Sequence, residues 1–125
     1  MKSAFEMPIL QGGVTCIGES RLQNIHRLRA HGINTSYMQL RILPRLEVEE
    51  VIASVDISLN SELRVITALA YAAHRRRLVH EVIVMVALGD LREGVWPDDL
   101  VPFVRHMIYL PGIRLVGLGT NLSCL

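Results

Sequence analysis

One lysine and twelve arginines make up the basic residues of this 125-residue chain, and the lysine is Lys2. A lysine amine can act as a nucleophile toward a carbonyl compound or as a base that moves a proton. Any reaction that needs a lysine therefore has Lys2 as its one candidate in this sequence.

A second candidate for chemistry, Arg92, lies between Gly89 and Gly94. Backbone N–H groups beside glycines can join a guanidinium in holding a carboxylate or a phosphate. An ion pair with Asp90 or Glu93 explains the same arginine equally well. The local sequence leaves both interpretations open.

Short apolar runs alternate with longer amphipathic segments, which predicts strands that alternate with helices. The predicted strands are 14–17, 37–43, 55–59, 82–88 and 113–119, and the predicted helices are 20–30, 46–53, 61–77 and 97–108. Ser20 and Gln23 have the spacing of a capping box, and Asn60 or Ser61 is the predicted cap of the third helix. The run 82–88 is apolar without alternation, as expected of a parallel strand covered on both faces.

Strands joined by short helical connections are predicted to be parallel, with right-handed crossovers. They build either an open doubly wound sheet or part of a (β/α)₈ barrel, and the pattern leaves this choice open. No G-x-G-x-x-G fingerprint of a dinucleotide site is present. Both folds bind ligands at the carboxyl ends of the strands, where this sequence places polar residues after four of its five predicted strands.

Composition and charge narrow the class of protein. Half of the residues are hydrophobic and the formal net charge is +1, which suits a globular α/β domain without a field that attracts nucleic acid. The five histidines lack the spacing of a zinc site, and the basic run 74–77 is interpreted as a helix end. Without a membrane-spanning run or a signal peptide, we expect a cytoplasmic protein in which Cys16 and Cys124 are reduced thiols.

Segments at the predicted strand ends are similar to one known family. They are GESRLQNI (18–25), VDISLNSEL (55–63), VMVALGDLREG with WPDDL (84–100) and LPGIRLVGLGTNLSCL (110–125). Together they resemble the alanine-racemase-like family of fold-type III pyridoxal phosphate enzymes, in particular the branch of ornithine and related amino-acid racemases. The resemblance extends in order over nearly the whole chain from about Gly12.

This resemblance implies a (β/α)₈ barrel with pyridoxal 5'-phosphate at the carboxyl ends of its strands. Lys2 is then the residue that forms the Schiff base with the cofactor and serves as one of two proton-transfer bases. Arg92 holds the substrate carboxylate, and Asn121 and Ser123 lie close to the cofactor. The family usually carries an acid where this chain has Ala87, and the sequence identifies no second acid or base.

With about five of eight strands, we expect residues 1–125 to form a single domain that is a partial barrel with two open edges. The chain is expected either to pair through those edges as a homo-oligomer, most simply a dimer, or to be a truncated product that folds poorly. The expected function is that of a pyridoxal phosphate-dependent racemase of a small amino acid, represented here by a truncated barrel whose activity is open. Two alternatives stay open: a non-catalytic pyridoxal phosphate-binding protein and a structural remnant without a ligand.

Overall fold

A computed structural model of the chain describes residues 6–41, 44–89 and 93–122. The α-helices are α1 (Glu6–Gln11), α2 (Leu22–Ala30), α3 (Val48–Ser54), α4 (Leu63–Arg75) and α5 (Leu100–Met107), and the 3₁₀ turns η1 (Arg45–Glu47) and η2 (Pro97–Asp99) precede α3 and α5. The strands are β1 (Cys16–Glu19), β2 (Ser36–Gln39), β3 (Ile57–Asn60), β4 (His80–Val86) and β5 (Ile113–Thr120). Each predicted strand starts within two residues of an observed one.

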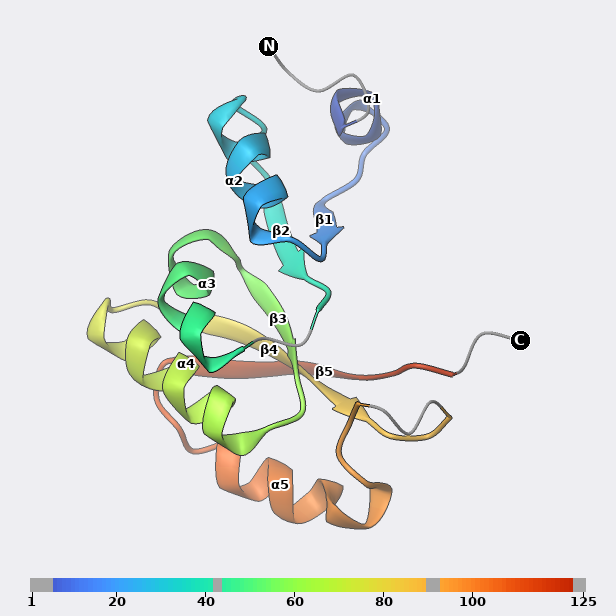
Figure 1. Cartoon of the computed structure of the whole chain (residues 1–125), viewed down its shortest axis with the longest axis vertical. Helices are drawn as coiled ribbons and strands as arrows, with labels where there is room; N and C mark the ends of the chain where they lie inside the picture. The colour runs from blue at the N-terminus through green and yellow to red at the C-terminus, as the bar shows by residue number, and fades with distance from the viewer. Residues whose placement is uncertain (1–5, 42–43, 90–92, 123–125) are drawn as a thin grey trace.

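The five strands form one parallel sheet in the order β1-β2-β3-β4-β5. Figure 1 shows α2, α3, α4 and α5 along one side of this curved sheet. A doubly wound sheet reverses its strand order part-way and carries helices on both faces. The sequential order with helices on one side is instead the winding of a (β/α)₈ barrel.

The helices pack on the sheet through apolar faces that the sequence predicts. The buried hydrophobic residues of α2, α3 and α4 are Leu22, Ile25, Leu28, Val48, Val51, Ile52, Val65, Ile66, Leu69, Ala70, Ala72 and Ala73. Their spacing of three and four residues places them on one side of each helix. In α5, Met107 is buried, whereas Ile108 is 58% exposed because the helix ends before it.

β4 is covered on one face only. Buried residues alternate with half-buried ones along the strand, in the order His80, Glu81, Val82, Ile83, Val84, Met85 and Val86. Helices α4 and α5 cover the buried face, and no described element covers the other (Figure 1). The prediction that this strand is covered on both faces is therefore wrong for the described part of the chain.

Two helices begin without the predicted caps. At the start of α2, the Glu19 carboxylate accepts the N–H groups of Ser20 and Arg21 at 2.8 and 3.1 Å, and no side chain caps the helix. Asn60 belongs to β3, and α4 begins after Glu62, again without a side-chain cap. Both capping predictions are wrong, because the helices begin later than predicted, after Arg21 and Glu62, and the Asn60 amide bonds to Ser58 of its own strand.

Candidate functional site

The carboxyl ends of the five strands meet at one edge of the sheet, which we call the carboxyl edge. The last residues of β1 to β5 are Glu19, Gln39, Asn60, Val86 and Thr120. Four of these five carry a polar side chain. In parallel α/β folds this edge is where ligands bind, because strand ends and the loops that follow them present their polar groups there.

The polar groups at the ends of β1 and β2 are held in place. Gln39 is buried, and its Nε2 donates a hydrogen bond to the Ser20 carbonyl at 3.0 Å. Desolvation alone raises the pKa of Glu19, but hydrogen bonds from Arg21, Asn24 and Ser20 and the charge of Arg21 outweigh it and lower the pKa. Glu19 therefore stays ionised and hydrogen-bonded at neutral pH, which makes it a structural anion at this edge.

At the end of β4 the chain leaves the sheet and returns to it. The Val95 N–H donates to the Met85 carbonyl at 2.8 Å, and the Ala87 N–H donates to the Val95 carbonyl at 2.9 Å. Gly94 has a φ of +133°, and a Cβ there would lie 2.6 Å from the Ala87 nitrogen, so only glycine fits. The loop that contains Arg92 is therefore anchored on both sides to the carboxyl end of β4.

A buried hydrogen-bonded chain leads from the start of β4 to the end of β3. Ser58 Oγ lies 2.7 Å from His80 Nε2, and Asn60 Nδ2 donates to Ser58 Oγ at 2.8 Å. Burial lowers the pKa of His80 to about 4, against a hydrogen bond to the Val55 backbone and nearby carboxylates that raise it. His80 is therefore neutral, its N–H donates to the Val55 carbonyl, and the Ser58 hydroxyl donates to the bare Nε2.

The sequence analysis did not predict this series of hydrogen bonds from His80 to Asn60. It gave Asn60 the role of a helix cap and grouped His80 with histidines that have no ligand spacing. Ser58 and His80 are 22 residues apart and meet only because β3 and β4 are neighbours. The signal that could have found them is the presence of polar residues within two strand-forming runs, Ser58 and Asn60 in 57–60 and His80 and Glu81 in 80–86.

Of the site residues predicted from sequence, the structure describes Asn121. It is exposed and directly follows β5, whose last residue, Thr120, donates from Oγ1 to the backbone carbonyl at the end of β4 at 2.9 Å. Asn121 therefore lies at the carboxyl edge, and its role in cofactor binding stays a prediction. Lys2, Arg92 and Ser123 lie outside the described residues, so their roles stay predictions.

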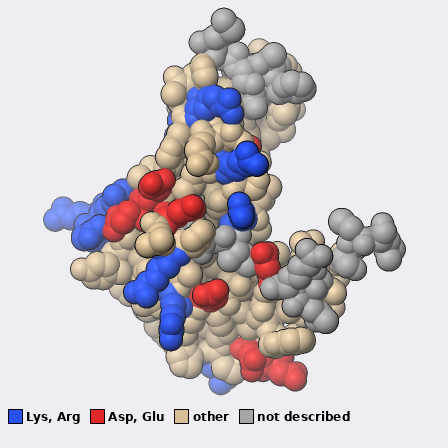
Figure 2. Space-filling view, in the orientation of Figure 1, with Lys and Arg blue, Asp and Glu red and all other residues tan. Residues whose placement is uncertain are grey.

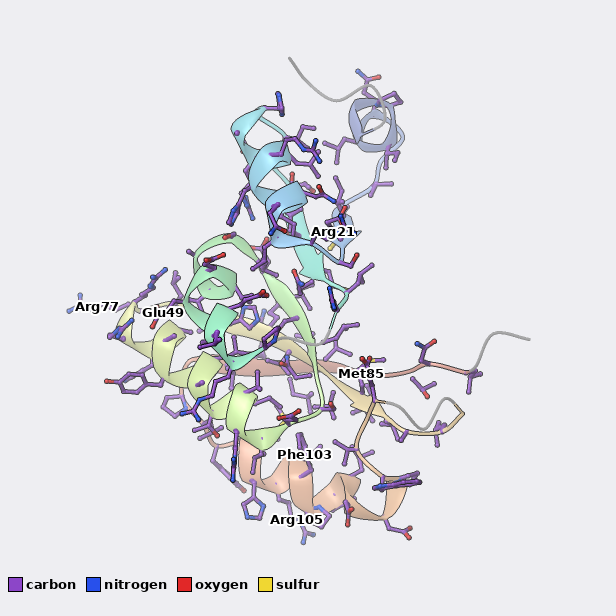
Figure 3. The ribbon with its side chains drawn as sticks, viewed as in Figure 1. Arg21, Glu49, Arg77, Met85, Phe103 and Arg105 are labelled. Carbon is purple, nitrogen blue, oxygen red and sulfur yellow. The ribbon has the colours of Figure 1, made fainter. Side chains whose placement is uncertain are left out.

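The sheet face that the helices leave open is apolar near Asn121. Gly117 pairs with Ile83 and Gly119 pairs with Met85, where β4 and β5 lie side by side in the sheet. Figure 3 labels Met85. A Cβ on Gly119 would lie 2.9 Å from Met85 Sδ, whereas a Cβ on Gly117 would meet only Ile83 Cγ1 at 3.9 Å. Bare backbone beside two flexible apolar side chains is a surface that fits the face of a planar aromatic ring, with the Asn121 amide at its border.

A cavity of about 540 Å³ lies on the helix side of the sheet, at the other end of the carboxyl edge. Its walls include Arg21 at the start of α2 (labelled in Figure 3), Arg41 after β2, and Glu47 and Glu50. Its charges are mixed, and it is formed at the ends of β1 and β2, away from Asn121 on β5. This polar cavity and the apolar open face therefore lie on different sides of the sheet.

Other kinds of site find no support in residues 6–41, 44–89 and 93–122. Within them, no three His, Cys, Asp or Glu side chains gather closely enough to hold a metal ion. The same ranges contain no helix with the length and apolar character needed to cross a membrane. Cys16 is a free thiol whose pKa is raised by burial and then by the charges of Asp56 and Glu81, so it is protonated and unreactive at neutral pH.

Comparison with known proteins decides the family. Residues 4–125 match the family model described as alanine racemase, N-terminal domain. The chain belongs to this family. It is 44% identical to the ornithine racemase of Acetoanaerobium sticklandii over 112 residues, which are 89% of this chain and 31% of that protein. It is 30% identical to the lysine racemase of Thermotoga maritima over 120 residues, 96% of this chain and 33% of that protein.

Solved structures of other proteins share this fold. An alanine racemase of Clostridium difficile 630 in complex with cycloserine matches 98% of the chain with a TM-score of 0.85, at 22% identity and over 34% of its own length. PipY of Synechococcus elongatus PCC7942, with pyridoxal phosphate bound, matches 99% of the chain with a TM-score of 0.85, at 16% identity and over 60% of its length. The expected partial (β/α)₈ barrel is confirmed, and the chain spans about a third of the length of the two curated relatives.

Proposed function

We propose that the chain is the cofactor-binding part of a pyridoxal phosphate-dependent amino-acid racemase. The observation that carries the proposal is the position of Asn121, exposed at the carboxyl end of a glycine-rich strand beside an open apolar face. Membership of the alanine racemase family and the 44% identity to an ornithine racemase support it. Because the chain spans about a third of such relatives, the activity is proposed for the assembly that contains it.

The described residues fit one side of the cofactor. Ile83, Met85 and the bare backbone at Gly117 form an apolar surface for the pyridine ring, and the Asn121 amide can hydrogen-bond to a polar group of the ring. Pyridoxal phosphate, when bound, withdraws electrons from the bond to the substrate Cα proton and so makes that proton acidic.

The remaining roles follow the predictions from sequence. Lys2 would hold the cofactor through its amine and, when that amine is free, would move a proton at the substrate Cα. Arg92 holds the substrate carboxylate through paired N–H donors, which fixes the Cα between acid and base. The loop anchors at Val95 and Gly94 support this role, because they fix both ends of the Arg92 loop at the carboxyl edge.

The second acid or base does not come from a described tyrosine. The Tyr37 hydroxyl donates to the Ile33 carbonyl at 2.7 Å inside the core. Tyr71 lies on α4 and Tyr109 follows α5, so both belong to the helix layer. We therefore propose that this group comes from a part of the assembled protein outside the described residues.

A second candidate function is pyridoxal phosphate binding without catalysis. The likeness to PipY supports the cofactor-binding part of this function, since that structure has pyridoxal phosphate bound. Both candidates place the cofactor at the same edge and differ in whether a substrate proton is moved.

One experiment separates the candidates. The chain is mixed with pyridoxal phosphate, its visible absorbance is recorded, and the mixture is reduced with borohydride and digested for mass spectrometry. We expect the cofactor on the peptide that contains Lys2, with the label lost in Lys2→Arg and in urea. Racemisation of L-ornithine, L-lysine or L-alanine by the assembled protein that contains this chain, followed by chiral chromatography, then supports the racemase. Labelling without racemisation by that assembled protein supports the binding protein, and absence of native-state labelling contradicts both.

A further inference from the structure

The wall of the cavity at the ends of β1 and β2 contains a buried acceptor that the protein does not use. Gln39 is 2% exposed, which makes it the most deeply buried residue of this wall. Its Nε2 donates to the Ser20 carbonyl at 3.0 Å, and this bond fixes the orientation of the amide. Its Oε1 has no hydrogen-bond partner among the described residues. Because a buried acceptor without a donor is destabilising, this oxygen favours a ligand that brings a donor.

The amino end of α2 borders the same cavity. The helix begins after Arg21 without a side-chain cap, and its first residues, Leu22 and Gln23, line the cavity. No group in the described part of the chain accepts the N–H of either residue. Free N–H groups at the start of a helix carry partial positive charge and favour an anion. Together with the guanidinium of Arg21, they suit the carboxylate of a ligand.

Two carboxylates come to the cavity from the next helical segment. Glu47 is the last residue of η1, Glu50 lies in the first turn of α3, and neither forms an ion pair within residues 6–41, 44–89 and 93–122. Arg41, which follows β2, also has no ion-pair partner in these ranges. Figure 2 shows acidic side chains over α3 and basic side chains over the ends of β1 and β2. The charges of Arg21, Arg41, Glu47 and Glu50 cancel, so the cavity suits a ligand that carries both signs of charge and no net charge.

The size and the remaining walls of the cavity narrow the class of ligand. Its volume of about 540 Å³ lies in the range of roughly 300–1,000 Å³ that is typical of sites for small molecules. Leu22 and Pro44 supply apolar surface between the charged groups. A small zwitterion with an apolar side chain therefore matches both the charges and the apolar surface.

We propose that this cavity binds a free amino acid with an apolar side chain. The carboxylate of the amino acid lies at Arg21, Arg41 and the amino end of α2. Its ammonium lies near Glu47 and Glu50 and donates a hydrogen bond to Gln39 Oε1. The cavity is on the helix side of the sheet, away from Asn121 and the open face, so the proposal does not depend on the proposed racemase function.

Binding of L-leucine and of two analogues tests the proposal. The backbone N–H signals of the ¹⁵N-labelled 125-residue chain are followed by NMR without pyridoxal phosphate. The analogues are 4-methylpentanoate, which lacks the ammonium, and 3-methylbutylamine, which lacks the carboxylate. We expect L-leucine to shift the signals of Leu22 and Gln23 in a saturable way. Each analogue should bind about tenfold or more weakly, because it loses one set of charged hydrogen bonds.

A variant of the two carboxylates tests how the ammonium is recognised. In Glu47→Gln/Glu50→Gln, the affinity for L-leucine should fall about tenfold, and the preference for L-leucine over 4-methylpentanoate should be reduced. A merely structural role of these residues would not change that preference. Asp98→Asn/Asp99→Asn, which neutralises two exposed carboxylates of η2 outside the cavity, is the matched control and leaves the affinity unchanged.

Circular dichroism of each variant shows whether it folds. If Glu47→Gln/Glu50→Gln does not fold, Arg41→Gln takes its place, and it should weaken binding of L-leucine while leaving 3-methylbutylamine unaffected. Absence of a saturable shift at Leu22 and Gln23 overturns the proposal and leaves the cavity to water. Equal affinity for the three compounds, or unchanged affinity and preference in the folded variants, overturns it as well.

Discussion

Ser58 and His80, 22 residues apart, share a buried hydrogen bond of 2.7 Å between β3 and β4. Neither side chain is more than 3% exposed. The bond lies on the helix side of the sheet, behind the open face. A second bond, from Asn60 Nδ2 to Ser58 Oγ, connects it to the carboxyl edge. The first bond joins His80, the first residue of β4, to Ser58, the second residue of β3, so it contributes to the register of the two strands.

Stability is expected to fall as the pH drops through the titration range of His80. Its pKa is about 4 in the native chain and near 6.5 when unfolded, so the unfolded state binds more protons between these values. The free energy of unfolding therefore rises with pH over this range, by on the order of 3 kcal/mol. Urea unfolding measured from pH 4 to pH 7 checks the slope. In His80→Gln the slope should be reduced; an unchanged slope would show that other groups cause it.

Removing the Ser58 hydroxyl should destabilise the chain by about 1–3 kcal/mol, because His80 Nε2 loses its donor and Asn60 Nδ2 loses one of its two acceptors. The measurement is urea unfolding of Ser58→Ala at pH 7. Ser36→Ala, at an exposed position of β2, is the control and should cost much less. Equal losses in the two variants would contradict the role given to the hydrogen bond.

Gly112 and Gly13 separate backbone strain from close packing. Both have positive φ, of +87° and +96°, but a Cβ on Gly112 would lie 2.5 Å from the Ala70 carbonyl, whereas Gly13 has nothing within 4 Å. Gly13→Ala should cost about 1 kcal/mol from strain alone. Gly112→Ala should cost about 2 kcal/mol more, because α4 must move away. Thermal unfolding of the two variants is the test, and similar losses would be inconsistent with this packing.

Much of the fold could be predicted from the sequence, because helix faces depend on local spacing. Leu22, Ile25 and Leu28 have a helical period that shows directly which side of α2 is buried. Neighbour contacts cannot be predicted in this way. The Glu19 carboxylate replaces Ser20 as the group that accepts N–H donors at the start of α2, and Asn60 turns toward Ser58 instead of α4. Both contacts depend on how the ends of the strands are placed in the folded protein.

The candidate site was predicted in part for the same reason. Asn121 could be placed because it follows an apolar run that can only be a strand. The open face of β4 could not be predicted, since an uninterrupted apolar run such as 82–88 does not show whether one or both faces of the strand are covered. The series of hydrogen bonds from His80 to Asn60 depends on the pairing of β3 with β4, and no local sequence pattern predicts that pairing.

The most direct test of the central claim is whether pyridoxal phosphate binds at the carboxyl edge beside Asn121. Side-chain amide signals of the ¹⁵N-labelled chain are followed by NMR while pyridoxal phosphate is added. Asn34 is the internal control, because it is also exposed but lies at the opposite edge, before β2. The account predicts that the Asn121 signal shifts with saturable dependence on cofactor concentration while the Asn34 signal stays in place. Saturable shifts at Asn34 with none at Asn121, or no shift at either, would contradict it.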